Sequence, residues 1–227
     1  IFLTGQRSVG WLGKTLSDTN NVPAQSLRIQ FGMYGRALNQ RLARPKESVE
    51  AVLLLEDGSI FSGFGFGAAR QVSGEVVFST SMVGYPETLT DPSYNGQILT
   101  LTYPLVGNYG VPPRNSEDGL LKYFESDSIK VKGLIVHELC KCPSHWQSRE
   151  SLDEWLMEEG VPGIWGIDTR KLVKKLRLKG VMHGLIEVCK EGDEPDLEKL
   201  RPKLKSVQEP NSRDLVGEVT IKEPVFH

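Results

Sequence analysis

The stretch at 74–94 limits the possible folds of this chain more than any other. Residues 75–80 are β-branched and aromatic, which predicts a strand. The segment that follows is polar and holds Pro86 and Pro92, so we expect a stiffened loop there. This loop carries a high density of hydroxyl, carboxylate and ring groups, namely Tyr85, Glu87, Thr90, Asp91, Ser93 and Tyr94. Because a loop that only turns needs fewer such groups, we expect this one to contact a ligand or a partner.

The composition is that of an ordinary folded protein. The chain has 227 residues, of which 39% are hydrophobic and 25% charged, enough for one domain with a core, with or without a tail. No apolar run approaches the ~20 residues that a membrane span needs, so we expect no membrane partner. Three cysteines form no disulfide framework, which favours a reducing compartment and a cytoplasmic location.

The charge is distributed unevenly along the chain. Residues 1–46 hold seven of the 27 basic residues and one of the 29 acidic ones, which leaves 20 basic and 28 acidic residues in the remainder. The mildly acidic body argues against a nucleic-acid partner. The basic segment 1–48 has an apolar stripe of Tyr34, Leu38 and Leu42, a pattern typical of mitochondrial targeting segments. It therefore predicts either a disordered extension or a targeting segment, and mitochondrial location is the alternative to the cytoplasm.

Short strands dominate the prediction up to residue 138. Residues 52–55 and 59–62 flank Asp57 and Gly58, a pair typical of a hairpin turn. A glycine alternates with phenylalanine at Gly63, Gly65 and Gly67, and no helical pattern follows. This pattern favours a strand that a neighbouring backbone approaches closely over a dinucleotide-binding loop. Further strands are predicted at 97–103, 130–138 and 181–188, and a short helix near 120–124.

Two helices are predicted late in the chain, at 151–159 and 168–179. Ser151 and Glu154 form the pattern of a capping box for the first helix, and Asp168 is a suitable N-cap for the second. The charged, proline-bearing segment at 190–227 is predicted to be linker-like, with a possible final strand at 217–222. These elements indicate an α+β domain over 50–189, with one or two sheets and helices on an outer face.

A group of potential metal ligands lies between residues 137 and 145. It consists of His137, Glu138, Cys140, Cys142 and His145. The cysteines are not spaced as zinc ligands usually are, and no second cysteine pair is present to close a tetrahedral site. We therefore expect no metal site, and interpret these residues as part of a strand and its following loop.

Five blocks of sequence resemble the N-terminal domain of the small, glutamine-handling subunit of carbamoyl-phosphate synthetase. They are LEDGS at 55–59, the stretch at 74–94, QILTLTYPLVGNYG at 97–110, YFES at 123–126 and GIDTR at 166–170. Together they span about residues 51–188. The PSHW block at 143–146 is similar to the animal form, in which this domain opens a longer fused protein of the pyrimidine pathway that also carries aspartate transcarbamylase and dihydroorotase.

The resemblance implies a domain of the swivelling β/β/α type without catalytic residues of its own. The catalytic cysteine, histidine and glutamate of the family belong to a second domain, expected after residue 227. None of the cysteines here lies in a Gly-x-Cys-x-Gly setting, so this chain alone is expected to lack glutaminase activity. The resemblance also implies that the domain binds no cofactor, since ATP, Mg²⁺ and bicarbonate are used by the synthetase part.

The implied work of the domain is to dock the glutaminase domain against the synthetase part and to complete the glutamine site. The implied pathway is pyrimidine synthesis, with arginine synthesis as the alternative. In the family the serine of the DPSY motif lines that site, and by position this is Ser93. The residues alone favour a serine that bonds its own backbone in a turn, and it is the resemblance that favours the role in the glutamine site instead. Supporting roles in the loop or interface are implied for Tyr85, Glu87, Asp91, Tyr94 and Asn108. The alternative function is a free-standing, non-catalytic binding module that kept the fold.

Overall fold

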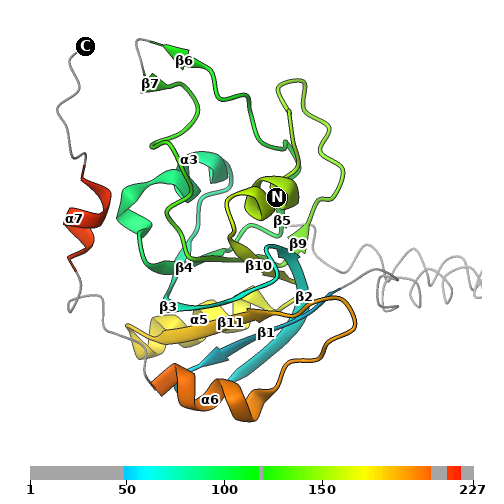
Figure 1. The fold of residues 1–227 in the computed structure, drawn as a ribbon, viewed down its shortest axis with the longest axis vertical. Helices are drawn as coiled ribbons and strands as arrows, with labels where there is room; N and C mark the ends of the chain where they lie inside the picture. The colour runs from blue at the N-terminus through cyan, green and yellow to red at the C-terminus, as the bar shows by residue number, and fades with distance from the viewer. Residues whose placement is uncertain (1–48, 118–119, 206–213, 221–227) are drawn as a thin grey trace, which may run out of the picture. The chain divides into compact units, whose positions relative to one another are not determined.

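A closed barrel of seven strands forms the centre of the protein, in the order β1-β11-β3-β4-β8-β10-β2 (Figure 1). The computed structural model describes residues 49–117, 120–205 and 214–220, so the predictions for 1–48 lie outside the described residues. The barrel strands are β1 (Val49–Leu55), β2 (Ile60–Gly67), β3 (Gln71–Ser79), β4 (Gln97–Leu101), β8 (Gly133–Ile135), β10 (Pro162–Trp165) and β11 (His183–Val188).

The predicted Asp-Gly hairpin joins β1 and β2, which pair antiparallel. Gly58 adopts a φ of 83°, a left-handed conformation that glycine reaches without strain. Asp57 stabilises the turn because its Oδ1 accepts a hydrogen bond from the Ser59 amide at 3.0 Å. The Lys175 Nζ lies 2.5 Å from Asp57 Oδ2, so the turn is also tied to a distant helix.

Closure of the barrel depends on glycines of β2 and β10. A Cβ added at Gly63 would lie 2.4 Å from the Trp165 carbonyl oxygen, and one at Gly163 would lie 2.3 Å from the Phe66 ring. Side chains at these positions would push the two strands apart. The glycine alternation therefore serves close backbone approach, as predicted, and β2 can pair with both β1 and β10.

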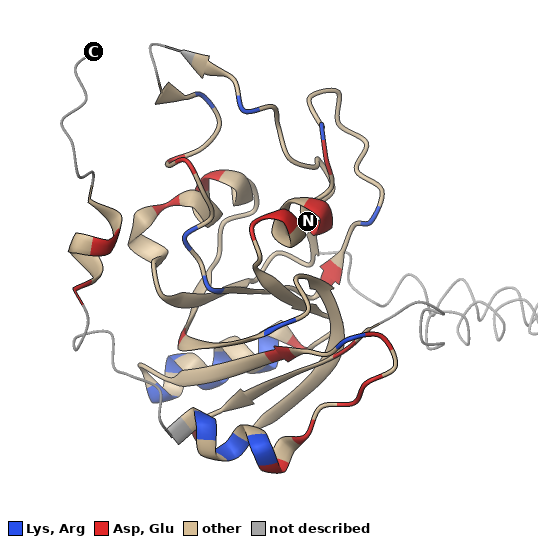
Figure 2. Ribbon diagram, in the orientation of Figure 1, with Lys and Arg blue, Asp and Glu red and all other residues tan. Residues whose placement is uncertain are grey.

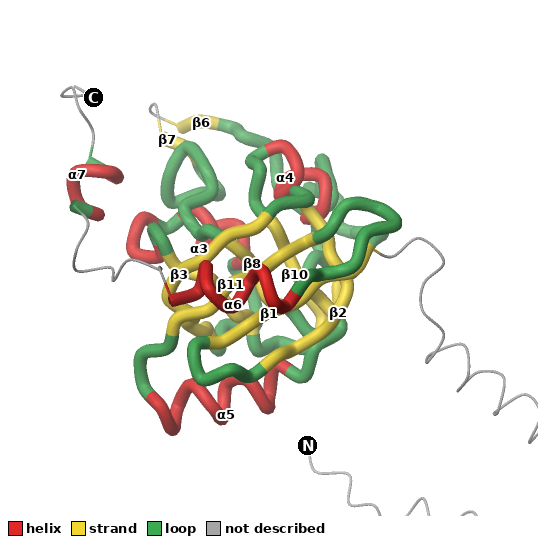
Figure 3. Tube along the Cα trace, turned by 60° about the horizontal axis from the view of Figure 1, so that its bottom comes forward, coloured by secondary structure: helices red, strands yellow, loops and turns green. Residues whose placement is uncertain are grey.

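Two hydrophobic clusters lie on either side of the barrel wall. The first fills the barrel interior and includes Ile98, Ile135 and Ile164, and helix α5 (Thr169–Lys179) adds Leu172 and Leu176 to it (Figure 3). The second lies outside, where helix α4 (Leu152–Glu158) packs its buried Trp155. The predicted capping box of Ser151 and Glu154 is present at the start of α4, and the Asp168 side chain accepts a hydrogen bond from the Lys171 amide at the start of α5.

Two local predictions between residues 80 and 140 are wrong. The segment 120–124 is not a helix, because β7 (Leu120–Leu121) pairs with β6 (Ser116–Glu117) instead. The long strand predicted at 130–138 ends at Ile135. A separate short strand, β9 (Glu138–Leu139), then pairs with β5 (Leu105–Val106) outside the barrel.

The loop predicted after β3 is also wrong in part. Residues Tyr85–Thr90 form the helix α3, which begins with Gly84 as its N-cap and Pro86 in its first turn. Proline is tolerated there because the first-turn amides have no partner within the helix. Tyr85 and Leu89 are buried against the outer cluster, so tertiary packing supplies the stability that six residues lack on their own.

The linker predicted at 190–227 contains two helices. Helix α6 (Leu197–Lys205) covers the outer face of β1 and β11, and its Leu200 and Leu204 pack against Val52, Leu54 and Leu185. Helix α7 (Leu215–Val219) stands where a final strand is predicted over 217–222, of which 221 and 222 lie outside the described residues. The Asp214 side chain caps α7 by accepting a hydrogen bond from the Gly217 amide at 2.9 Å. Within the described ranges, no helix is long and apolar enough to cross a bilayer.

We expect Leu200→Ala to destabilise the domain by about 2–3 kcal/mol, because it leaves a cavity beneath α6. Leu200 is 1% exposed. Leu178→Ala is the matched control, because Leu178 is a helical leucine that is 88% exposed, and the effect expected for it is within about 0.5 kcal/mol. Urea unfolding of both variants measures the difference. Equal effects would show that α6 does not cover the sheet.

The Asp57–Lys175 ion pair should make stability depend on pH. Lys175 holds the pKa of Asp57 down, from 3.8 to about 2, against a smaller opposing effect of burial. A depressed carboxyl pKa adds stability that is complete above the unfolded pKa and is lost as pH falls through the folded pKa. We therefore expect Asp57→Asn to cost about 1 kcal/mol near neutral pH, and the cost to shrink between about pH 4 and pH 2.

Urea unfolding at a series of pH values tests this dependence. Asp127→Asn is the control, since the Asp127 side chain is 88% exposed and pairs with a neighbour three residues away, Lys130. Its effect should be smaller. A cost for Asp57→Asn that stays constant down to pH 2 would contradict the assignment.

Candidate functional site

All candidate residues except Asn108 lie along one connection, from the end of β3 through α3 and the 3₁₀ turn η2 (Pro92–Tyr94) to the start of β4. Asn108 lies in the loop after β5 (Leu105–Val106). Tyr85 is the first residue of α3, and Ser93 is the middle residue of η2. The segment 82–97 contains no lysine or arginine. Basic side chains gather instead on α5 and α6 (Figure 2).

The N-terminal end of α3 is held by the hydroxyl groups of two tyrosines, Tyr85 and Tyr109, each of which bonds to backbone groups of the opposite segment. The Tyr109 hydroxyl oxygen accepts hydrogen bonds from the amides of Gly84, at 2.8 Å, and Tyr85, at 3.1 Å. In return, the Tyr85 hydroxyl donates to the Gly110 carbonyl at 2.5 Å. The two rings stack with their centroids 4.3 Å apart. This arrangement satisfies first-turn amides of α3 and ties the helix to the loop at 107–110.

Both tyrosines are structural rather than acid–base groups. Burial raises the pKa of Tyr85, and the neighbouring Tyr109 raises it further. Burial likewise raises the pKa of Tyr109, although the hydrogen bonds from Tyr85 and Gly84 oppose the effect. Both phenols are therefore neutral at physiological pH. The sequence did not predict a role for Tyr109, because its contact with α3 is formed only in the folded structure.

The C-terminal end of α3 is anchored at Thr90, which is 1% exposed. Its hydroxyl donates to the Pro86 carbonyl at 2.8 Å and accepts a hydrogen bond from the Glu125 amide at 3.0 Å. The Thr90 carbonyl also accepts a hydrogen bond from the Ser126 hydroxyl at 2.5 Å. Contacts to the YFES block thus fix the point from which η2 begins.

Asp91 builds the turn that presents Ser93. Its Oδ1 accepts a hydrogen bond from the Ser93 amide at 2.8 Å, and its carbonyl accepts one from the Tyr94 amide at 3.1 Å. The Tyr94 ring packs against the outer cluster. Ser93 itself is exposed, and its hydroxyl forms no hydrogen bond with the residues that the structure describes. The turn is therefore closed by Asp91 and the backbone, and the serine hydroxyl is left for another partner.

The predicted site residues fall into two groups. Asn108 is exposed and lies beside the N-terminal end of α3, where it lines a hollow together with Tyr85. Glu87 is half-buried near the same end, where its charge helps to raise the pKa of Tyr85. Ser93 lies beyond the other end of α3, a six-residue helix that spans about 9 Å. Asn108 follows β5 and Ser93 lies in η2, so the two residues do not form one pocket.

The hollow beside Asn108 has an apolar rim. It is a shallow depression, and the large exposed hydrophobic side chains at its edge are Met82 (71% exposed), Val83 (73%) and Tyr103 (40%). We call these three residues the rim patch. Neighbouring exposed apolar side chains of this size are typical of a surface that another protein covers.

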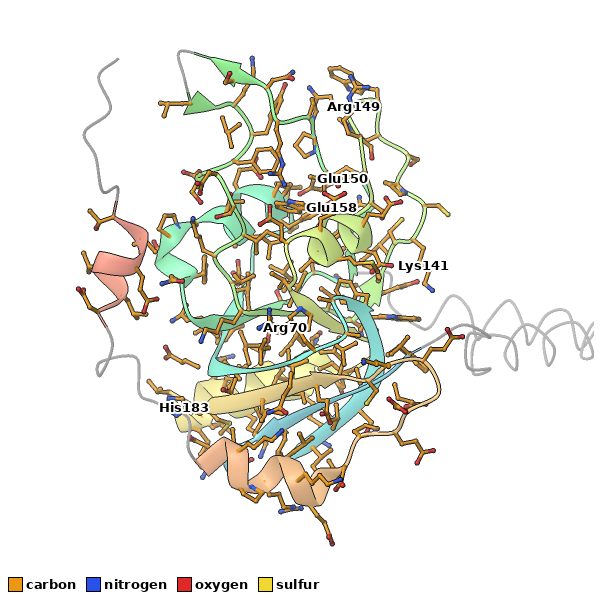
Figure 4. All side chains as sticks on the ribbon, viewed as in Figure 1. Arg70, Lys141, Arg149, Glu150, Glu158 and His183 are labelled. Carbon is orange, nitrogen blue, oxygen red and sulfur yellow. The ribbon has the colours of Figure 1, made fainter. Side chains whose placement is uncertain are left out.

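Two other groups of titratable residues lie apart from this connection. Burial raises the pKa of Glu150, and Glu158 of α4 raises it further; Figure 4 shows the two side by side. In the segment 137–145, for which no metal site is predicted, the Cys140 thiol donates to the Cys142 carbonyl at 3.4 Å. In the part of the chain that the structure describes, no three His, Cys, Asp or Glu residues are grouped so that they could hold a metal ion.

Comparison with known proteins shows the family of the chain. The family model of the carbamoyl-phosphate synthase small chain, CPSase domain, matches residues 53–186, which is more than half of the chain. The chain belongs to this family. The match spans the barrel from β1 to β11 and includes α3, η2 and the rim patch. Assignment to the swivelling β/β/α type stays a prediction.

Curated relatives are similar over most of this chain. The multifunctional protein CAD of Squalus acanthias is 53% identical over 179 residues, which cover 78% of this chain and 8% of that protein. The carbamoyl phosphate synthase small chain of Pyrococcus furiosus is 51% identical over 176 residues, 77% of this chain and 46% of its own length. The arginine-specific small chain of Chaetomium globosum is 44% identical over 234 residues, 99% of this chain and 49% of that protein. The chain thus spans less than half the length of these relatives.

We expect Tyr109→Phe to destabilise the protein by about 1–3 kcal/mol, because two amides at the start of α3 lose their acceptor. Thermal or urea unfolding measures this effect, and hydrogen exchange of the Gly84 and Tyr85 amides should become faster. Tyr103→Phe is the matched control, since Tyr103 is 40% exposed and its hydroxyl bonds to none of the described residues. If both variants were equally stable, Tyr109 would not hold α3.

Proposed function

We propose that this domain is a non-catalytic part of a glutamine-dependent carbamoyl-phosphate synthetase, in which it docks the glutaminase domain against the synthetase part. We further propose that Ser93 completes the glutamine site from outside the catalytic domain. Membership of the small-chain family supports the first statement. The observation that carries the second is the exposed hydroxyl of Ser93, which bonds to none of the described residues, on a turn that Asp91 holds closed.

The chemistry of Ser93 suits this role. A serine hydroxyl can donate one hydrogen bond and accept others, so it can bind either the ammonium or the carboxylate group of an amino acid. Asp91 and Thr90 hold the backbone on the N-terminal side of the serine, and the Tyr94 ring holds the other side. A hydroxyl on a held turn loses little conformational entropy on binding, which favours affinity.

The rim patch supports the docking role. Met82 and Val83 precede α3, and Tyr103 follows β4, so the patch is continuous with the connection that carries Ser93. Partner domains that cover these side chains would bury apolar surface while the barrel keeps α3 in place. We propose that the glutaminase domain and the synthetase part meet this side of the barrel.

The remaining chemistry lies in other parts of the enzyme. L-glutamine would bind at the domain boundary, and the ammonia released from it would pass internally to the synthetase, which uses ATP, Mg²⁺ and bicarbonate. The product would serve pyrimidine or arginine synthesis. Relatives include both the multifunctional protein CAD and a small chain named as arginine-specific. We propose a cytoplasmic location, with the mitochondrion as the alternative if residues 1–48 are a targeting segment.

The experiment is Ser93→Ala in the parent enzyme that contains the catalytic parts. Loss of a hydrogen bond to a charged group costs about 1.5 kcal/mol or more, so the KM for glutamine should rise about 10-fold or more. Ammonia-dependent synthesis should stay unchanged, because it bypasses the glutamine site. Ser62→Ala is the control, since Ser62 is an exposed serine on β2. An unchanged KM for glutamine in Ser93→Ala would remove Ser93 from the site.

A further inference from the structure

Helix α7 lies beside the turn that carries Ser93, on the same side of the barrel as α3 (Figures 1 and 3). A hydrogen bond joins the two segments across 123 positions of sequence. The Asn95 Nδ2 donates to Glu218 Oε2 at 3.0 Å. Asn95 comes two residues after Ser93, so this bond reaches the turn itself.

Helix α7 is linked to the turn by a polar contact. Its own turn is formed locally, where the Glu218 amide donates to the Asp214 carbonyl at 3.1 Å and the Thr220 hydroxyl donates to the Val216 carbonyl at 2.6 Å. None of its residues is buried, and Val216 is 74% exposed. Apolar burial of α7 is therefore slight, and the hydrogen bond from Asn95 to Glu218 is a contact that links α7 to the turn.

Asn95 also closes the η2 turn. Its amide donates to the Pro92 carbonyl at 3.0 Å. This hydrogen bond closes a turn from Pro92 to Asn95, and Ser93 lies within that turn. Asp91 holds this turn on its N-terminal side through the Ser93 amide, and Glu218 holds it on the other side through the Asn95 side chain. A displacement of Asn95 would displace Ser93.

We propose that Asn95 and Glu218 are positioning residues, which clip α7 to η2 and thereby hold the Ser93 hydroxyl at the place where it meets bound glutamine. This inference rests on the proposed function and deepens it. The clip links residues that are 123 positions apart in the sequence, so α7 and the turn that carries Ser93 are held together.

The kinetic test compares Glu218→Ala, Glu218→Gln and Asn95→Ala in the parent enzyme. The two alanine variants should raise the KM for glutamine about 2- to 5-fold, as expected for a single exposed hydrogen bond. Glu218→Gln should keep a KM near the wild-type value, because its amide oxygen can still accept from Asn95. Ammonia-dependent kcat should not change in any of them. Glu194→Ala removes an exposed acid from a loop and serves as the control.

The double variant Asn95→Ala/Glu218→Ala tests whether the two residues act as a pair. We expect its KM to equal that of either single variant, because each substitution alone already breaks the bond. Multiplied effects, or a KM unchanged in both single variants, would overturn the proposal. If Ser93→Ala raises KM and the clip variants do not, only the clip fails. If Ser93→Ala has no effect, the proposed function of Ser93 fails first.

A readout that needs no catalytic domain is hydrogen exchange of the 227-residue chain. The Asn95 amide bonds to Pro92 inside the turn, so Glu218→Ala should make it exchange about 2- to 5-fold faster, and Glu218→Gln should not. Exchange at Val76 of β3 should stay the same in all variants, since its amide pairs with the Met182 carbonyl. Equal exchange of Asn95 in wild type and Glu218→Ala would contradict the clip.

Discussion

The close approach of β2 to β10 is the contact on which the rest of the structure depends. Gly63 and Gly163 leave room for the Trp165 carbonyl and the Phe66 ring, and side chains there would separate the strands. With the barrel closed, β3 and β4 lie parallel and adjacent, so the chain between them must leave the sheet and return. That excursion is α3 and η2. The position of Ser93 thus follows from the parallel pairing of β3 and β4 within the barrel, because parallel neighbours need a crossover connection.

The connection between β3 and β4 is held at several points, and each uses a different kind of contact. Tyr109 accepts hydrogen bonds from the first amides of α3, Thr90 bonds to the YFES block at its end, and Asp91 closes η2. These contacts stabilise the conformation of the connection, and none of them involves the Ser93 hydroxyl. The residues that hold the connection are therefore different from Ser93, the residue proposed to bind glutamine. This arrangement explains how a polar loop can expose one hydroxyl that bonds to none of the described residues, on a turn closed by other hydrogen bonds.

Errors of prediction concentrate where tertiary contacts override local pattern. The segment 85–90 is polar and contains proline, yet it is helical because Tyr85 and Leu89 are buried against the outer cluster. The segment 197–205 is charged and contains Pro202, yet Leu200 and Leu204 bring it onto the sheet. Short helices of this kind have little stability of their own, so a local pattern that disfavours them is overridden by burial.

The sequence by itself determined the elements whose signals are local. The Asp-Gly hairpin, the capping box at Ser151, the N-cap at Asp168 and the five blocks that mark the family all lie within short windows. Only the tertiary structure decided that seven strands close into a barrel, that Tyr109 supports α3 and that Glu218 reaches Asn95. The Tyr109 and Glu218 contacts join residues 24 to 123 positions apart, and their geometry follows from the packing of the whole chain rather than from any one segment.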